Sequence, residues 1–161
     1  MIQMLSKRDL SILSNLRKNS RLKLTTMSKL THIPTSTIFD RMRVHEQRVI
    51  KRYTSLLNYE KLGYEIRANI LIKASQECKL KLSDYLKSNP YVNSLFKLNN
   101  EYDFIVDVVF RNRRAMEGFL ARIKEGFQLE VIEVLPVVEE VKREGFLAEP
   151  SIVEFFAYAG N

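Results

Sequence analysis

The sequence predicts an α+β protein: an N-terminal winged-type helix-turn-helix of three helices, joined by an extended strand to a βαββαβ ferredoxin-like domain. Three observations predict this class. Apolar residues recur with helical period in the first part of the chain, they alternate in the later part, and the positive charge is concentrated at the start. The expected boundaries are a helix-turn-helix domain (1–52), a linker strand or hinge (53–64), a ferredoxin-like domain (65–145) and an apolar tail (146–161).

The first expected helix spans Leu5–Asn19. Ser6 can cap its N-terminus, and Asp9 follows three residues later, which is close to a capping-box arrangement. Basic residues line the side opposite its apolar face, which consists of Leu5, Ile12, Leu13 and Leu16.

Two further helices are expected, one from Thr25 or Thr26 to about Thr31 and one over Thr35–Gln47. The break between them, His-Ile-Pro at 32–34, fits because proline favours an extended residue before it and tolerates the first helical turn after it. A tight break between two short helices is typical of a helix-turn-helix. The residues expected to point inward are Met27, Leu30, Ile38, Phe39 and Met42.

The segment that follows the helices changes character. Residues 49–58 are β-branched and aromatic at their start, which predicts a strand or an extended connector, and Gly63 marks a boundary. The later pattern predicts strand, helix, strand, strand, helix, strand, a split-βαβ order that forms a four-stranded antiparallel sheet with both helices on one face. The segments are Glu65–Ala74, Glu77–Ser88, Tyr91–Leu98, Tyr102–Phe110, Arg114–Phe127 and Val131–Val141.

The other face of this sheet needs a partner or must remain solvated. Because Tyr102–Phe110 carries apolar residues on both faces, we expect sheet-to-sheet dimerisation, with a solvated monomer as the alternative. The tail contains the apolar segment Ser151–Tyr158, which also requires burial. An extra strand or an arm swapped onto the partner subunit is expected there, and an ordinary intramolecular strand fits equally well.

The charge of the chain is divided unevenly. Residues 1–60 hold 12 Lys and Arg against 4 Asp and Glu, whereas residues 61–161 hold 14 against 15. A basic module on a near-neutral body predicts that the module contacts a polyanion, with a generally basic surface as the alternative.

Composition argues against several classes of protein. No apolar run approaches the roughly 20 residues that cross a bilayer, and the N-terminus lacks a signal-peptide core, so a cytoplasmic protein without a membrane partner is expected. Cys78 is the one cysteine, and with two distant histidines it gives no metal-ligand spacing, so neither metal nor cofactor is expected. We interpret His32 as a turn residue and His45 as a half-buried helix residue rather than as pH sensors.

Several short motifs occur together along the chain. The most specific is the connector Arg52–Gly63, which reads RYTSLLNYEKLG. The others are Leu5, Asp9 and Ile12-Leu13 in the first helix, Arg21 after it, Arg41-Met42-Arg43 in the third helix, Tyr102-Asp103, and Glu139-Glu140-Val141-Lys142. Over about residues 5–145 the sequence therefore resembles the Lrp/AsnC (leucine-responsive, feast/famine) family of transcription regulators.

The sequence departs from the family pattern at three glycine positions. His32 takes the place of the turn glycine, Arg48 that of the glycine closing the third helix, and Asn100 that of the loop glycine. Asn tolerates positive φ, so the loop can form, but its side chain enters the edge of the family's effector pocket.

The resemblance implies a regulator that binds a promoter or operator in double-stranded DNA as a homodimer, tetramer or octamer. In it, the ferredoxin-like domain would dimerise and sense an amino acid or a related small molecule. Asp103 could hold the ammonium group of such an effector or could bond nearby backbone N–H groups. The candidate effector-binding residues are Asn100, Glu101, Tyr102 and Asp103.

Duplex DNA is read by side chains that reach base edges and is held by Lys and Arg at its phosphates. The N-terminal residues of a recognition helix usually reach the bases, so Ser36, Thr37 and Arg41 are predicted to enter the groove. Thr35 and Asp40 are further candidates on that helix. Phosphate contacts are predicted for Lys29, Arg43, Arg48, Lys51 and Arg52.

Two other functions fit parts of the pattern. Siroheme decarboxylases resemble this family too, and the resemblance implies that they use His and Arg in the α/β body; residues 61–161 contain no histidine, so an enzyme is not expected. A sequence-blind architectural DNA binder would share the basic module but show little preference among sites.

Overall fold

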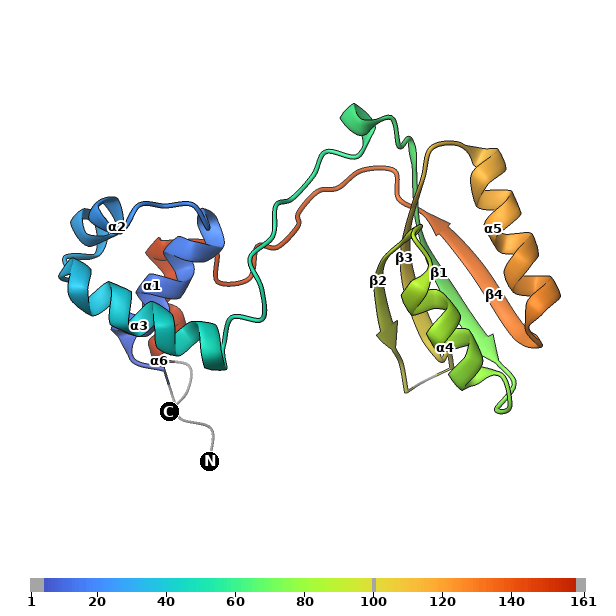
Figure 1. The fold of residues 1–161 in the computed structure, drawn as a ribbon, viewed down its shortest axis with the longest axis horizontal. Helices are drawn as coiled ribbons and strands as arrows, with labels where there is room; N and C mark the ends of the chain where they lie inside the picture. The colour runs from blue at the N-terminus through green and yellow to red at the C-terminus, as the bar shows by residue number, and fades with distance from the viewer. Residues whose placement is uncertain (1–4, 100, 159–161) are drawn as a thin grey trace. The chain divides into compact units, whose positions relative to one another are not determined.

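The computed structural model describes residues 5–99 and 101–158, with no side chains described beyond Phe155. The chain forms two compact units. The first, called the head, contains residues 1–56 together with 141–161, and the second, called the body, contains residues 57–140. Two segments of chain therefore connect the units, one entering the body and one returning from it (Figure 1).

The head contains the three predicted helices, α1 (Lys7–Lys18), α2 (Leu24–Thr31) and α3 (Thr35–Arg48). Ser6 and Asp9 form the expected capping box at the start of α1. His32 caps the C-terminus of α2 in the left-handed region at φ 57°, a backbone conformation that usually favours glycine. The core where the helices meet is small and consists of Ile12, Leu16, Met27, Ile33 and Ile38.

Two residues expected in this core lie outside it. Leu30 is 61% exposed and Phe39 is 50% exposed, so the prediction that they point inward was wrong. Neighbouring residues in a helix point about 100° apart, and Ile38 already occupies the inward position beside Phe39.

Residues 50–58 leave the head without forming a strand, so the extended connector is correct and the linker strand is wrong. Among the described residues, no other segment pairs with residues 51–58 in a sheet. A short 3₁₀ turn, Glu60–Leu62, follows, and Gly63 closes it at φ 80°.

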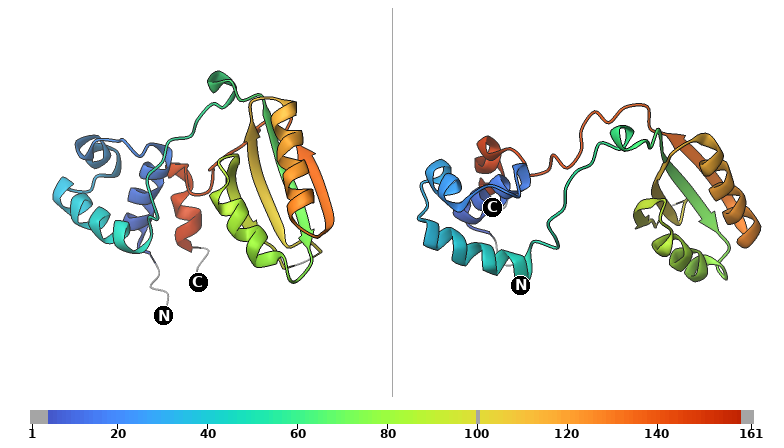
Figure 2. Two further views of the ribbon diagram at one scale, coloured as in Figure 1. Left: turned by 45° about the vertical axis from the view of Figure 1, so that its right-hand side comes forward. Right: turned by 45° about the horizontal axis from the view of Figure 1, so that its top comes forward.

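The body has the predicted βαββαβ order around a four-stranded antiparallel sheet. The sheet order is β2-β3-β1-β4, and helices α4 and α5 cover one face (Figure 2). Residues such as Ile70, Val106, Leu86 and Phe119 fill the layer between sheet and helices. The elements are β1 (Ile66–Ala74), α4 (Lys79–Ser88), β2 (Val92–Lys97), β3 (Phe104–Phe110), α5 (Arg113–Gly126) and β4 (Leu129–Pro136).

Two details of the body differ from expectation. The last strand ends at Pro136 rather than at Val141, because proline lacks the N–H that would continue the ladder. Leu80, expected on the apolar side of α4, is 80% exposed, whereas Leu82 and Leu86 are buried.

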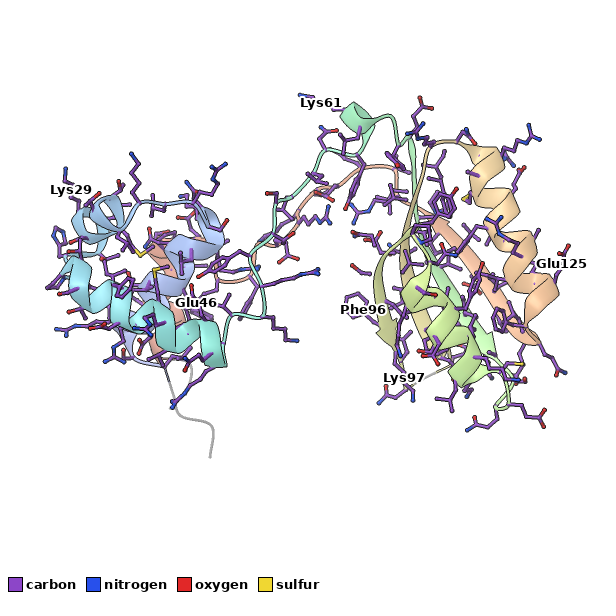
Figure 3. The ribbon with its side chains drawn as sticks, viewed as in Figure 1. Lys29, Glu46, Lys61, Phe96, Lys97 and Glu125 are labelled. Atoms are coloured by element: carbon purple, nitrogen blue, oxygen red, sulfur yellow. The ribbon has the colours of Figure 1, made fainter. Side chains whose placement is uncertain are left out.

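The open face of the sheet is partly apolar. The strand register places Phe96 opposite Ile105, Asn69 opposite Leu135 and Lys73 opposite Val131, all on the face away from the helices. One end of this face carries a polar cluster, in which Arg67 donates to both carboxylate oxygens of Asp107, at 3.0 and 3.1 Å. The side chain of Phe96 projects from β2 (Figure 3).

The tail is helical, not a strand. A 3₁₀ turn (Pro150–Ile152) leads into α6 (Val153–Tyr158), which packs against α1 of the same chain. The expected extra strand or swapped arm is therefore replaced by a fourth helix of the head. Pro150 at the first turn favours the helix, and Val153 is buried there.

Three ion pairs join the tail region to α1. They are Lys7–Glu154 at 2.5 Å, Arg17–Glu144 at 2.8 Å and Lys18–Glu149 at 3.6 Å. Arg17 also donates to the backbone carbonyls of Glu144 and Phe146. Among the residues that the structure describes, no helix is both long enough and apolar enough to cross a membrane.

Candidate nucleic-acid interface

Helix α3 has an inner and an outer face. Ile38 and His45 are buried on the inner face. At its N-terminus Thr35 and Ser36 are exposed and Thr37 is half-buried, while Pro34 at the cap position supplies no side-chain acceptor for the first N–H groups. The predicted base-reading end of the helix is therefore accessible.

A groove of about 660 Å³ lies beside this end of α3. Thr37 and the 31–34 break line one side, and Lys7 and Arg8 from the start of α1 line the other. Arg8 is exposed and was not among the residues predicted to contact DNA. Its basic charge is visible in the sequence, but its position beside α3 depends on how the helices pack.

A second groove, of about 690 Å³, lies between the end of α1 and the connector. Its floor includes Leu13, Leu16 and Ile50. Its rim brings the predicted phosphate residues Lys51 and Arg52 together with cations that were not selected, and includes one acid; these are Arg17, Lys18, Arg21 and Glu144.

A side-chain hydrogen bond links the connector to α3. The hydroxyl of Tyr53 donates to Oε1 of Glu46 at 3.0 Å. Burial, together with the hydrogen bond and the charge of Glu46, raises the pKa of Tyr53 to about 12. This contact holds the start of the connector, with Lys51 and Arg52, beside the C-terminal half of α3.

The remaining predicted phosphate residues are accessible. Lys29 on α2 and Arg48 at the end of α3 are exposed, and Figure 3 shows Lys29 extending away from α2. Arg43 lies over the exposed ring of Phe39, with its guanidinium carbon 6.0 Å from the ring centre. Within the described part of the chain, Lys29, Arg43 and Arg48 form no ion pair, unlike the α1 cations engaged by the tail.

Arg41 has a more specific environment. Its Nη1 lies 3.4 Å from Oδ1 of Asp9, whose carboxylate also lies 3.0 Å from Nε2 of the buried His45. Burial would raise the pKa of Asp9, but the hydrogen bonds from Ser6, the charge of Arg41 and the hydrogen bond from His45 outweigh it and lower that pKa. Asp40, by contrast, is exposed on the outer face.

The candidate effector loop is engaged with its own chain. Asn100 lies outside the described residues, and Glu101 is exposed. The hydroxyl of Tyr102 donates to Glu133 at 2.7 Å, and this hydrogen bond, with some desolvation, raises the pKa of Tyr102. Asp103 accepts from the N–H of Ala74 at 2.9 Å and pairs with Lys79 at 2.7 Å.

The two partners of Asp103 determine the direction in which its pKa shifts. Burial acts to raise its pKa, but the contacts from Lys79 and Ala74 outweigh burial and lower it. The carboxylate is thus ionised and already bonded to an ammonium group and a backbone N–H. Across residues 5–99 and 101–158, no group of His, Cys, Asp and Glu side chains could hold a metal ion.

Curated relatives match most of the chain. It is 34% identical over 143 residues to an uncharacterized HTH-type transcriptional regulator of Pyrococcus furiosus. The aligned region covers 88% of this chain and 96% of the relative. It is 33% identical over 113 residues to the HTH-type transcriptional regulator FL11 of the same organism, covering 70% and 75%. No model of a known protein family matches the chain. The relatives are transcription regulators, which rules against the siroheme-decarboxylase alternative.

Solved structures share the fold. AsnC of Escherichia coli has a TM-score of 0.78 at 21% identity, with 88% of this chain and 97% of that chain covered. LrpC of Bacillus subtilis has a TM-score of 0.79 at 18% identity, with 87% and 99% covered. The complex of transcriptional regulator NMB0573 from Neisseria meningitidis with L-Met has a TM-score of 0.81 at 22% identity, with 87% and 94% covered.

Proposed function

Because the chain belongs to the Lrp/AsnC family of HTH-type transcriptional regulators, we propose that it is a sequence-specific regulator that binds operator DNA in the cytoplasm as a dimer or higher oligomer. The observation that carries this proposal is the accessible N-terminal end of α3, which lies beside basic residues from α1. A major groove admits one helix, and the side chains at its N-terminus reach the base edges.

The proposed DNA contacts have two roles, base reading and phosphate binding. Ser36, Thr37 and Arg41 contact base edges, with Thr35 and Asp40 beside them. Phe39 is added to this group because its exposed ring can contact a thymine methyl. The phosphates are held by cations from the two grooves and the outer face, namely Arg8, Lys29, Arg43, Arg48, Lys51 and Arg52.

The open face of the sheet supports dimerisation. Phe96 is 59% exposed and Leu135 is 47% exposed, and both lie on the face that no helix covers. A second copy placed face to face would bury them, and a two-fold dimer presents two copies of α3 to a pseudo-palindromic site. Further assembly into a tetramer or octamer would use other surfaces.

We also propose that an amino acid or a related molecule modulates the assembly. A structural neighbour was solved with L-Met, and the loop 100–103 of this chain is the candidate site. Because Lys79 already occupies the carboxylate of Asp103, an effector's ammonium group would have to displace it. Light scattering with and without a panel of amino acids tests assembly and sensing together; an unchanged mass with every amino acid contradicts the sensing role.

Competition between DNA fragments tests sequence specificity. A promoter fragment, first that of the protein's own gene, is competed against bulk DNA at fixed salt. A specific regulator binds its site roughly 10³-fold or more tightly than bulk DNA, whereas a sequence-blind architectural protein shows little preference. Equal competition by both DNAs contradicts the proposal.

Two variants separate base reading from phosphate binding. Arg41→Ala is expected to reduce sequence preference by about 1–3 kcal/mol. Lys51→Ala is expected to weaken binding to all sequences and to reduce the salt slope by about 1. If Arg41→Ala weakens binding to all DNA equally, the base contact assigned to Arg41 is wrong.

A further inference from the structure

Asp9 is an acidic residue buried in the most basic part of the chain. It is 4% exposed, on the first turn of α1. A negative charge close to a surface proposed to bind phosphates opposes binding, and the capping box at Ser6 is one role that offsets this cost. Its remaining partners indicate a second role.

The contacts of Asp9 fall into two groups. Within α1, Oδ2 accepts from the backbone N–H of Ser6 at 3.2 Å and from its hydroxyl at 2.5 Å. Across to α3, Oδ1 lies 3.0 Å from Nε2 of His45 and 3.4 Å from Nη1 of Arg41. An ionised carboxylate has enough acceptor positions for all of these donors.

The two α3 partners differ in exposure. The His45 side chain is 3% exposed, whereas that of Arg41, four residues earlier on the same helix face, is 51% exposed. His45 thus contacts Asp9 on the buried side of α3, while Nη1 of Arg41 lies 3.4 and 3.5 Å from the two Asp9 oxygens and about half of the Arg41 side chain stays exposed. A guanidinium has five N–H donors in a fixed fork, so one Asp9 contact leaves others for a base.

We propose that Asp9 is a positioning residue for base reading, which holds the guanidinium of Arg41 at the edge of α3 before DNA arrives. The proposal rests on the function proposed above, in which Arg41 contacts a base edge. A long side chain fixed in advance loses less conformational entropy on binding than a free one, so the base contact is strengthened without any new contact to DNA.

A double-mutant cycle in the full chain tests this role. The variants are Asp9→Asn, Arg41→Ala and the combination, and the probes are a duplex selected from a random-sequence pool and a shuffled duplex of the same composition. The measured quantity is the ratio of the two affinities. Asp9→Asn should lower this ratio about 5-fold or more when Arg41 is present, but less than about 2-fold when Arg41 is alanine.

The cycle distinguishes this inference from the function on which it rests. An equal loss in both backgrounds means that Asp9 acts only through the fold, and it overturns the inference while leaving Arg41 as a base reader. An unchanged ratio in Arg41→Ala itself overturns the base contact and the inference with it. Binding to the shuffled duplex should not weaken in Asp9→Asn, because removal of an acid cannot reduce attraction to phosphate.

Ser6→Ala is the matched control for the capping contacts. It removes the side-chain cap of α1 but leaves the Asp9–Arg41 pair in place. A lower melting temperature with an affinity ratio within about 2-fold of the original is expected. A loss of the ratio equal to that of Asp9→Asn would attribute the effect to capping and would overturn the inference.

A measurement on the unmodified protein covers the case in which Asp9→Asn does not fold. Side-chain NMR relaxation of arginine Nε–H groups reports their order without DNA. Arg41 should be more ordered than Arg48, which is exposed and forms no ion pair with a described residue. Equal mobility of the two guanidinium groups contradicts the inference.

Discussion

The head and the body bury different kinds of side chain. The buried cluster of the body contains twelve residues, all apolar, between one sheet and two helices. The buried cluster of the head contains five, and Asp9, Ser14, Asn15 and His45 are buried around them. Among the described residues of the body, Asp107 is the one polar residue that is buried as a whole, and the hydroxyl of Ser75 is also buried.

This difference indicates which interactions stabilise each unit. The body has enough apolar area to be stabilised by hydrophobic burial, which does not depend on direction. The head has a small core, so polar contacts with defined geometry orient its helices. The unit that is proposed to contact DNA is therefore the one whose geometry depends on individual polar residues, and four predictions test the contrast.

The largest effect is expected in the body. Phe119 is fully buried, with its ring centre 5.3 Å from that of Phe110. Phe119→Ala should reduce the free energy of unfolding of the body by about 3–5 kcal/mol, through lost burial and a cavity. Hydrogen exchange should show lost protection in β1 and β3, with α1–α3 less affected. Equal loss in both units would mean that they unfold together and would remove the contrast.

A smaller effect is expected from a polar residue of the head. His45→Ala leaves a buried carboxylate without one of its donors and should destabilise the head by about 1–3 kcal/mol. Protection of amides in α1 and α3 should fall while that of β1 and β3 stays unchanged. Gln47→Ala, an exposed position on the same helix, is the control and should change stability by less than about 0.5 kcal/mol.

Variants of two adjacent tail residues compare the stability contributed by apolar burial with that contributed by an ion pair. Val153→Ala removes buried apolar atoms and should destabilise the head by about 1.6 kcal/mol, from two lost methylene equivalents. Glu154→Gln removes the exposed partner of Lys7 and should produce no measurable change, since solvent and salt already screen the pair. Thermal unfolding of the two variants measures the change in stability of the head. A larger loss of stability for Glu154→Gln than for Val153→Ala would show that the ion pair, rather than apolar burial, holds the tail on α1.

Acid is expected to have the smallest effect. The pKa values of Asp9 in the head and Asp103 in the body are both lowered, so the unfolded chain takes up protons first as the pH falls. Each carboxylate therefore stabilises its unit at pH values above 3.8, the ordinary pKa of an aspartate carboxyl group. This stability is lost as the pH falls below that value.

Variants of these two acids separate the units. Asp9→Asn should flatten the acid dependence of head protection alone, and Asp103→Asn that of the body alone. Hydrogen exchange at several pH values, corrected for intrinsic rates, measures the effect. If either variant flattens the acid dependence of both units, their stabilities are coupled.

The parts of the structure predicted from sequence are those that local patterns determine. Element order, the capping box at Ser6 and Asp9, and the inner residues of the sheet all follow from spacing within a few residues. Phe39 and Leu30 were misplaced because periodicity indicates an apolar face but not how much room the neighbouring helices leave.

The remaining errors concern distant partners. Residues 151–158 have strand-like composition, and their helix depends on packing against α1, near the other end of the chain. The contact of Asp9 with His45 joins positions 36 apart, and nothing in the sequence around either residue indicates it. The proline at position 150 was the one local signal of the tail helix, since proline is favoured in a first helical turn.

The interrupted head has a consequence for the order of synthesis. The chain that forms the body, residues 57–140, lies between the helices α1–α3 and the segment that packs on α1. Because the N-terminal part of a chain leaves the ribosome first, α1–α3 emerge well before their fourth helix and must wait for the whole body to be translated. A nascent or truncated product that stops within the body thus carries the unit proposed to contact DNA without its last helix.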